Sequence, residues 1–271
     1  MNNQNQNAFA GVSVHPAALA LFKLPASLLS VAADAKTVKG AAAGYLTGIL
    51  YLAPGTLAGV GNLCPHASHG CAAACLFTAG RAGMFEAINS ARVMRTRLLH
   101  SDRAAFLEIL RGEIRALVRK AARLGLRPAV RLNGTSDLPW ESLAPSLFAE
   151  FPKIRFYDYT KSARRALAFA RGELPENYHL TFSLSESNAT QAALVAAAGC
   201  NVAAVVAGYR AGEGFQMAGQ TFSTFDADRH DVRFLDRRAE DGRGRVGILK
   251  AKGKAKKDES GFVVRLNPVK I

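Results

Sequence analysis

The sequence predicts an α/β fold with a parallel sheet, and three observations support this prediction. Short apolar runs recur about 24 residues apart, helix-compatible segments (Ser162–Arg171 and Ala189–Ala198) separate the later runs, and polar turns follow several of them. Strand and helix alternating at this period imply right-handed crossovers between parallel strands. The runs are Ala129–Leu132, Ile154–Tyr159, His179–Leu184 and Val202–Ala207.

The architecture we expect is a partial TIM-like (βα) barrel, with an open doubly wound sheet as the alternative. Its first strand is the apolar run Leu46–Leu52, which ends before Pro54 and Gly55. A Gly-rich loop that carries the cysteines follows this strand. Two later runs, Val232–Leu235 and Val246–Leu249, extend the series, and a last strand is expected at Phe262–Leu266.

Two helices are predicted after the cysteine loop, and the first covers Phe85–Leu99. Ser101 is the expected N-cap of the second helix, Asp102 lies in its first turn, and Gly125 ends it. The predicted apolar face of the second helix consists of Leu107, Leu110, Ile114, Leu117, Ala121 and Leu124. Arginines between these positions predict a basic, solvated opposite face.

Residues 1–43 are expected to be a flexible and loosely helical lead-in, and residues 44–271 a single α/β barrel-like domain with a basic C-terminal loop. The early apolar segment Ala17–Ala33 is interrupted by Lys23 and Pro25 and is too short to span a membrane. Met1–Asn7 lacks the basic residues of a secretory signal. We therefore expect a cytoplasmic protein that does not enter the membrane.

The net charge of +14 is concentrated in two segments. Arg81–Arg127 carries 11 basic and 4 acidic residues, and Arg229–Ile271 carries 13 basic and 6 acidic residues, so each contributes +7. This distribution makes nucleic acid or another polyanion a candidate partner, because release of counterions from phosphates favours binding. A solvated helix face and a solvated tail are the alternative. Lys250–Lys257 has the composition of a mobile, phosphate-contacting loop.

Three of the four cysteines lie within twelve residues, with the spacing C-x6-C-x3-C. They are Cys64, Cys71 and Cys75. A tight cluster in a chain without a secretory signal indicates a metal or redox site rather than disulfides. Three thiolates can hold an iron–sulfur cluster or Zn²⁺, and His66 or His69 can complete a Cys₃His zinc site. Three buried, inert cysteines are the alternative. The fourth, Cys200, is expected to be a small core residue.

Polar turns follow successive predicted strands, at the rim where functional groups gather in parallel α/β folds. Asn133-Gly134-Thr135-Ser136-Asp137 follows the second strand, Tyr159-Thr160-Lys161 ends the third, and Ser185-Glu186-Ser187-Asn188 follows the fourth. Each motif alone is also explained as a turn or an N-cap. Their coincidence at one rim favours a site.

The order of strand, three-cysteine loop, helix and strand with a Gly-containing polar turn resembles the radical SAM superfamily. Tyr159–Lys161, Leu174–Asn177 and Phe182–Asn188 resemble segments of phage-associated radical-SAM-like proteins. The stretch from about Leu46 to Leu266 is similar to the phage "gene product 88" type of protein. This resemblance implies a partial TIM-like barrel that holds a [4Fe–4S] cluster and S-adenosylmethionine (SAM). The chain departs from the usual C-x3-C-x2-C spacing.

The resemblance also implies roles for residues at the predicted rim. Cys64, Cys71 and Cys75 would ligate iron. The candidates for binding SAM are Asn133, Gly134, Thr135, Ser136 and Asn188. The candidates for catalysis are Asp137, Lys161 and Glu186.

A second candidate metal site lies near the C-terminus and consists of Asp226, Asp228, His230 and Asp231. Three carboxylates and a histidine within six residues can hold a hard divalent ion. A solvated loop before the strand predicted at Val232 is the alternative. Trp140 and Tyr157 can stack on bases, or pack in the core.

Two functions follow from these observations. The first is a phage-type iron–sulfur, radical-SAM-like enzyme in the host cytoplasm, acting on a nucleotide, nucleic acid or macromolecular substrate. The second is a basic nucleic-acid-binding replication or processing protein in which the cysteines hold a structural zinc.

Overall fold

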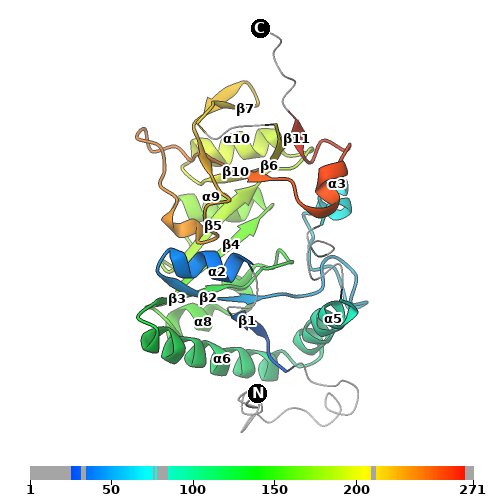
Figure 1. The fold of residues 1–271 in the computed structure, drawn as a ribbon, viewed down its shortest axis with the longest axis vertical. Helices are drawn as coiled ribbons and strands as arrows, with labels where there is room; N and C mark the ends of the chain where they lie inside the picture. Colours follow the sequence, from blue (N-terminus) through cyan, green and yellow to red (C-terminus); the bar gives the residue numbers. More distant parts are fainter. Residues whose placement is uncertain (1–25, 32–34, 76, 78–84, 209–211, 266–271) are drawn as a thin grey trace. The chain divides into compact units, whose positions relative to one another are not determined.

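The computed structural model describes residues 26–31, 35–75, 77, 85–208 and 212–265 (Figure 1). The chain divides into two compact units. Unit 1 consists of Met1–Pro65 and Phe85–Phe156, and unit 2 of His66–Met84 and Tyr157–Ile271. Each unit is described by itself.

Nine strands form a mixed, largely parallel sheet that is not closed within the described residues. The strand order is β1-β2-β3-β4-β5-β6-β10-β9, with β11 beside β6. The bounds are β1 Leu29–Val31, β2 Tyr45–Leu50, β3 Arg127–Arg131, β4 Arg155–Thr160, β5 Tyr178–Ser183, β6 Val202–Ala207, β9 Thr224–Asp226, β10 Val246–Lys250 and β11 Val264–Arg265. This confirms the predicted α/β class and the parallel character of the sheet.

In unit 1, β2 pairs in parallel with β3 and antiparallel with β1. Every residue of β2 is buried, as its unbroken apolar run predicts. The helix α2 (Ala35–Ala42) lies in the segment predicted to be loosely helical, whereas β1 was not predicted; residues 1–25 lie outside the described residues. Glu113 fixes the start of β1, because its two carboxylate oxygens accept hydrogen bonds of 2.7 Å from the N–H groups of Leu28 and Leu29.

The helices of unit 1 are α2, α5 (Glu86–Ser101), α6 (Arg103–Arg123), α7 (Trp140–Leu143) and α8 (Pro145–Glu150). Helix α6 contacts β1, β2 and β3, with Leu110, Ile114 and Leu117 buried. The predicted N-cap was wrong by one residue: Asp102, and not Ser101, accepts a hydrogen bond of 2.9 Å from Ala105 N–H.

One other prediction for α6 needs correction. Leu124, predicted on the apolar face, is 56% exposed, because it follows the last helical residue and Gly125 turns the chain with φ 65°. The basic face predicted for α6 is confirmed, since Arg103, Arg115, Arg119 and Arg123 are exposed.

In unit 2, β5, β6, β10 and β9 run parallel, and β11 also pairs with β6. Helices α9 (Ala163–Ala170) and α10 (Ala189–Ala197) contact β5. The main core cluster includes Phe182, Val202, Phe215, Phe222 and Ile248. Cys200 belongs to this cluster and is fully buried, which confirms the prediction that it is a core residue; burial raises the pKa of its thiol to about 12.

The strand predicted at Val232–Leu235 was wrong. Arg233–Leu235 form a 3-10 turn, η2, in which Leu235 N–H donates to the Val232 carbonyl. The place beside β10 is taken by β9, a three-residue strand. A hairpin of β7 (Phe215–Met217) and β8 (Gln220–Phe222) was also missed; Ala218 and Gly219 at its tip both have positive φ. None of the helices in the described residues has the length and apolar character needed to cross a membrane.

Candidate functional sites

In unit 1, Cys64 lies between the loop after β2 and the turn after β3. Its half-buried Sγ accepts from Gly55 N–H at 3.4 Å and donates to the Thr135 carbonyl at 3.7 Å. Two further bonds join the same segments: Thr135 Oγ1 donates to the Leu52 carbonyl at 2.5 Å, and Asp137 N–H to the Leu63 carbonyl at 2.8 Å. Within unit 1, the cysteine segment and the polar turn therefore meet.

Asn133 organises the turn after β3 from a buried position. Its Oδ1 accepts from Ser136 Oγ at 2.7 Å, Leu138 N–H at 3.0 Å and Trp140 Nε1 at 3.2 Å. Its Nδ2 donates to the Leu138 carbonyl at 2.9 Å. The amide of Asn133 and the hydroxyl of Ser136 thus have local structural partners, as the turn interpretation predicts.

Gly134 allows a close approach of backbones in the same turn. A Cβ at this position would lie 2.6 Å from Tyr51 Cδ1 and 2.7 Å from the Leu50 carbonyl oxygen. Its N–H donates to that same carbonyl at 2.9 Å. The glycine is therefore explained by packing of the turn against β2.

In unit 2, Cys71 lies on the short helix α3 (His69–Ala73), which Glu186 holds in place. Glu186 Oε1 accepts from Gly70 N–H at 2.7 Å, and Oε2 accepts from Ser68 Oγ at 2.8 Å. Ser68 Oγ in turn caps the helix by accepting from Cys71 N–H at 3.2 Å. Within this unit, the cysteine segment therefore contacts a residue of the turn after β5.

Packing around Gly70 reinforces this arrangement. A Cβ on Gly70 would lie 2.1 Å from Ser260 Oγ and 2.8 Å from Phe262 Cβ. Next to the helix, Ala74 is buried in a small cluster with Ala255 and Val263. Cys75 follows this buried alanine and is half-buried.

Desolvation acts to raise the pKa of Glu186, but the hydrogen bonds from Gly70 N–H and the Ser68 hydroxyl outweigh it. The net result is a pKa below the usual value for a glutamate. Glu186 therefore carries its charge as an acceptor for α3 at neutral pH. This makes it a positioning residue in the geometry described here.

Lys161 and Asn188 lie at the ends of β4 and β5 and bond to the same serine. Lys161 Nζ donates to Ser183 Oγ at 2.6 Å and lies 5.5 Å from the centre of the Phe262 ring. Asn188 Oδ1 accepts from Ser185 N–H at 2.7 Å, and its Nδ2 donates to the Ser183 carbonyl at 3.1 Å. Asn188 thus closes the turn after β5.

All four cysteines are free thiols. Cys64 belongs to unit 1, whereas Cys71 and Cys75 belong to unit 2. Within the described part of the chain, no group of three or more His, Cys, Asp or Glu side chains is arranged to hold a metal ion.

The acidic cluster near the C-terminus is spread over separate local interactions. Asp226 Oδ1 accepts from Asp228 N–H at 2.8 Å. Asp228 binds Lys252 Nζ at 2.5 Å through Oδ1 and accepts from Lys250 N–H at 2.8 Å through Oδ2. Asp231 Oδ2 accepts from the Tyr157 hydroxyl at 3.1 Å. Tyr157 and Trp140 are both fully buried, so they pack in the core rather than being exposed for base stacking.

His230 contacts a buried ion pair that the sequence analysis missed. Arg233, 1% exposed, lies with its Nε 3.2 Å from Asp236 Oδ2, and its Nη2 donates to the His230 carbonyl. Burial raises the pKa of Asp236 to about 6, although Arg233 opposes the shift. Burial, together with Arg233, lowers the pKa of His230. The ion pair between Arg233 and Asp236 was not predicted, because Arg233 lies in an apolar stretch for which a strand was predicted.

A basic turn follows β10 in unit 2 and forms the 3-10 segment η3 (Gly253–Lys257). We call Lys254, Lys256 and Lys257, which are exposed, the lysine turn. Ala255 between them is 2% exposed and packs in the cluster with Ala74 and Val263. Asp258, directly after the turn, accepts from Val263 N–H at 2.9 Å and Ser260 Oγ at 2.7 Å. The segment predicted as a mobile loop is thus an anchored turn.

The family model described as Gene product 88 matches residues 27–266. The chain belongs to the Gene product 88 family. No curated protein and no solved structure gives a significant match to this Gene product 88 chain. The family resemblance drawn from the sequence is therefore confirmed, while the resemblance to the radical SAM superfamily gains no support from the match.

Proposed function

We propose that this Gene product 88 protein binds nucleic acid, with the lysine turn as a principal phosphate contact. The observation that supports this proposal is the alternation of exposed lysines with a buried anchor at Ala255. Lysine ammonium groups recognise phosphates as point charges and contribute sequence-independent affinity. The net charge of +14 favours association with a polyanion in the same way.

Contacts on both sides hold the turn in place, which lowers the conformational entropy that its lysines lose when they bind phosphate. On one side, Lys252 forms an ion pair with Asp228, which also accepts from the backbone N–H of Lys250. On the other side, Arg265 Nη2 donates to the Asp258 carbonyl at 2.9 Å. A cationic segment that is already ordered loses less conformational entropy on binding than a disordered one.

The test is to replace Lys254, Lys256 and Lys257 by alanine together and to measure binding of a fluorescent single-stranded oligonucleotide. A matched control replaces Arg119, Lys120 and Arg123, which are exposed on α6 in the other basic segment. We expect the lysine-turn variant to lose at least about tenfold in affinity and the control to lose much less. Equal losses in both variants would indicate a general charge effect and refute the role of the turn.

A second proposal concerns the cysteines: we propose that they bind iron–sulfur or zinc. Its support is the local placement of two cysteines. Cys71 lies on a helix fixed by Glu186 and Ser68, and within unit 1 Cys64 Sγ donates to the Thr135 carbonyl in the turn after β3. Thiolates are the ligands that iron–sulfur clusters and Zn²⁺ prefer. The partial TIM-like barrel, SAM binding and the catalytic assignment of Asp137, Lys161 and Glu186 belong to the iron–sulfur form of this proposal.

Metal content after anaerobic purification tests the second proposal. The variants are Cys71→Ala and, as a matched control, Cys200→Ala, whose thiol is buried in the core. We expect stoichiometric iron with sulfide, or zinc, in the wild type and the control, and loss of metal in Cys71→Ala. Wild-type protein without bound iron or zinc would refute a metal role for these cysteines.

A further inference from the structure

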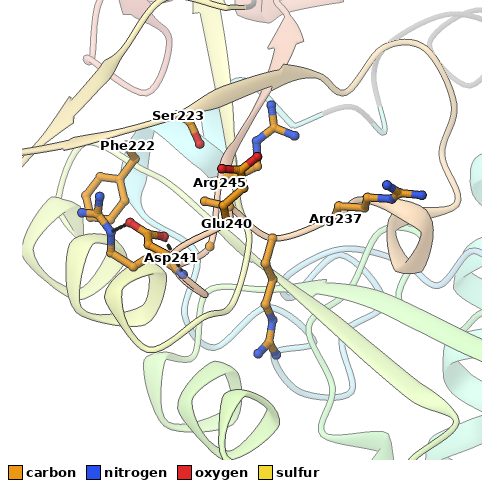
Figure 2. A pocket seen from close by; sticks show the side chains of 10 residues that line it. Phe222, Ser223, Arg237, Glu240, Asp241 and Arg245 are labelled. Atoms are coloured by element: carbon orange, nitrogen blue, oxygen red, sulfur yellow. Dashed lines mark hydrogen bonds and ion pairs between the residues drawn. The ribbon is translucent and has the colours of Figure 1, made fainter.

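An open, arginine-rich pocket of about 670 Å³ lies in unit 2, apart from the strand-end residues described above (Figure 2). Four arginines and two carboxylates line it, so the cations exceed the anions by two. Together with Phe222 and Ser223, its main lining residues are Arg237, Arg238, Glu240, Asp241, Arg243 and Arg245.

Two of the arginines are already oriented by their neighbours. Arg243 Nε donates to Asp241 Oδ2 at 2.7 Å, and its guanidinium carbon lies 5.4 Å from the centre of the Phe222 ring. Arg245 Nη2 donates to the Thr224 carbonyl at 2.5 Å, and its guanidinium carbon lies 5.4 Å from the Phe225 ring centre. These contacts fix the two planar groups before any ligand binds.

Arg237 and Arg238 are exposed residues of the segment that follows η2. Figure 2 shows the Arg237 side chain extending away from Asp241. Unlike Arg243 and Arg245, they line the pocket as exposed side chains. The pocket thus combines two arginines held by neighbouring groups with two exposed arginines.

The pocket and the lysine turn lie at opposite ends of β10. Arg245 comes directly before the first residue of this strand, and the lysine turn follows its last residue, Lys250. Five residues of extended strand correspond to roughly 16 Å. One phosphate group therefore cannot contact both sites.

We propose that this pocket binds the phosphate groups of a free nucleotide. Arginine guanidinium groups form bidentate bonds with phosphate oxygens, and a volume of about 670 Å³ is within the range of small-molecule sites. The exposed carboxylate of Glu240 provides an acceptor of the kind that ribose hydroxyls bind. This proposal does not depend on nucleic-acid binding by the lysine turn.

The experiment measures binding of ATP and of pyrophosphate to the full chain by titration calorimetry at low salt. The pocket variant is Arg237→Ala with Arg238→Ala, which leaves the structurally bonded Arg243 and Arg245 in place. The control variant is Arg119→Ala with Lys120→Ala, which removes two exposed cations of α6 and so matches the change in charge. Thermal unfolding without ligand checks that each variant is folded, and the single variants Arg237→Ala and Arg238→Ala replace the double variant if it is not.

We expect saturable binding of both probes to the wild type and to the control, and at least about a tenfold loss of affinity in the pocket variant. Absence of saturable binding to the wild type, or equal affinity in the pocket variant, would overturn the proposal. An oligonucleotide added in competition separates the two sources of phosphate. If nucleic acid displaces ATP and its own binding is lost in the pocket variant, the pocket is part of the nucleic-acid site and the free-nucleotide proposal is wrong.

Discussion

Glu186 connects the segment that carries Cys71 to the end of β5 within unit 2. Its two oxygens accept from Gly70 N–H and the Ser68 hydroxyl, and Ser68 in turn caps Cys71 N–H. The resemblance to radical SAM proteins implied a catalytic role for Glu186. The observed hydrogen bonds give it a positioning role, since they explain how a five-residue helix is held.

Replacing Glu186 by alanine should loosen α3, because two bonds to a charged acceptor are lost together. Hydrogen–deuterium exchange of a peptide covering residues 66–75 would show this as faster exchange. Glu259→Ala, which removes an exposed carboxylate near the lysine turn, is the control. Unchanged exchange in the Glu186 variant would mean that its carboxylate does not hold the helix.

Asp236 gives the protein a predicted pH dependence. Its pKa is about 6 in the folded protein, against 3.8 for an unperturbed aspartate, so between these pH values the folded state binds more protons than the unfolded state. Stability contributed by this residue is therefore present below about pH 4 and is lost as the pH rises to about 6.

The measurement compares the free energy of unfolding of the wild type with that of Asp236→Asn from about pH 4 to pH 7. The wild type should lose up to roughly 3 kcal/mol relative to the variant as the pH rises. His230, whose pKa is lowered and whose Nε2 lies 3.8 Å from Asp236 Oδ1, acts in the opposite direction in the wild type. A difference that does not change with pH would contradict the raised pKa of Asp236.

At the scale of elements, two glycines of unit 1 differ in the space that a Cβ would have at their positions. Gly134 lies in the turn after β3, where a Cβ would contact Tyr51 and the Leu50 carbonyl at less than 3.0 Å. Gly112 lies in α6, where a Cβ would meet nothing within 4 Å. The first glycine is required by packing, and the second only lowers the propensity of its helix.

Alanine substitutions at these two positions should therefore have opposite effects. We expect Gly134→Ala to destabilise the protein by about 1–3 kcal/mol because of overpacking against β2. Gly112→Ala should stabilise it by about 0.5–1 kcal/mol through helix propensity. Urea denaturation measures both, and a stabilising Gly134→Ala would show that the turn does not pack as described.

The longer strands were predictable because their apolar runs are long and regularly spaced, as in β2, β5 and β6. The three-residue strands β1 and β9 were not, because so short a run carries little periodicity. The stretch at Val232–Leu235 was misread because Arg233 is stabilised there by Asp236, a partner that hydrophobic pattern does not reveal.

For the candidate sites, the sequence predicted which turns carry polar residues but not what those residues bond. Asn133 and Asn188 satisfy local groups of their own turns. The arginine pocket could not be found from spacing, because it combines Phe222 with residues fifteen or more positions later in the chain. For the pocket, the missing information is a contact between segments rather than a property of one segment.

For the whole molecule, the dominant physical property is the net charge of +14, and in unit 2 the structure presents part of it as an ordered lysine turn. Basic side chains that neutralise phosphates release counterions, so binding must weaken as salt is added. The contribution of each lysine to this salt dependence can be measured directly as a change in slope. A change in slope indicates that a phosphate contact has been lost, whereas unfolding of the variant would abolish binding altogether.

The decisive measurement is the oligonucleotide dissociation constant of the wild type and of the Lys254, Lys256 and Lys257 triple alanine variant, determined between about 50 and 200 mM salt. We predict that the wild type binds and that its affinity falls steeply with salt. The logarithmic slope of the variant should be shallower by about two, roughly 0.7 for each phosphate contact removed from a single strand. No binding at the lowest salt, or identical slopes for the two proteins, would contradict nucleic-acid binding through the lysine turn.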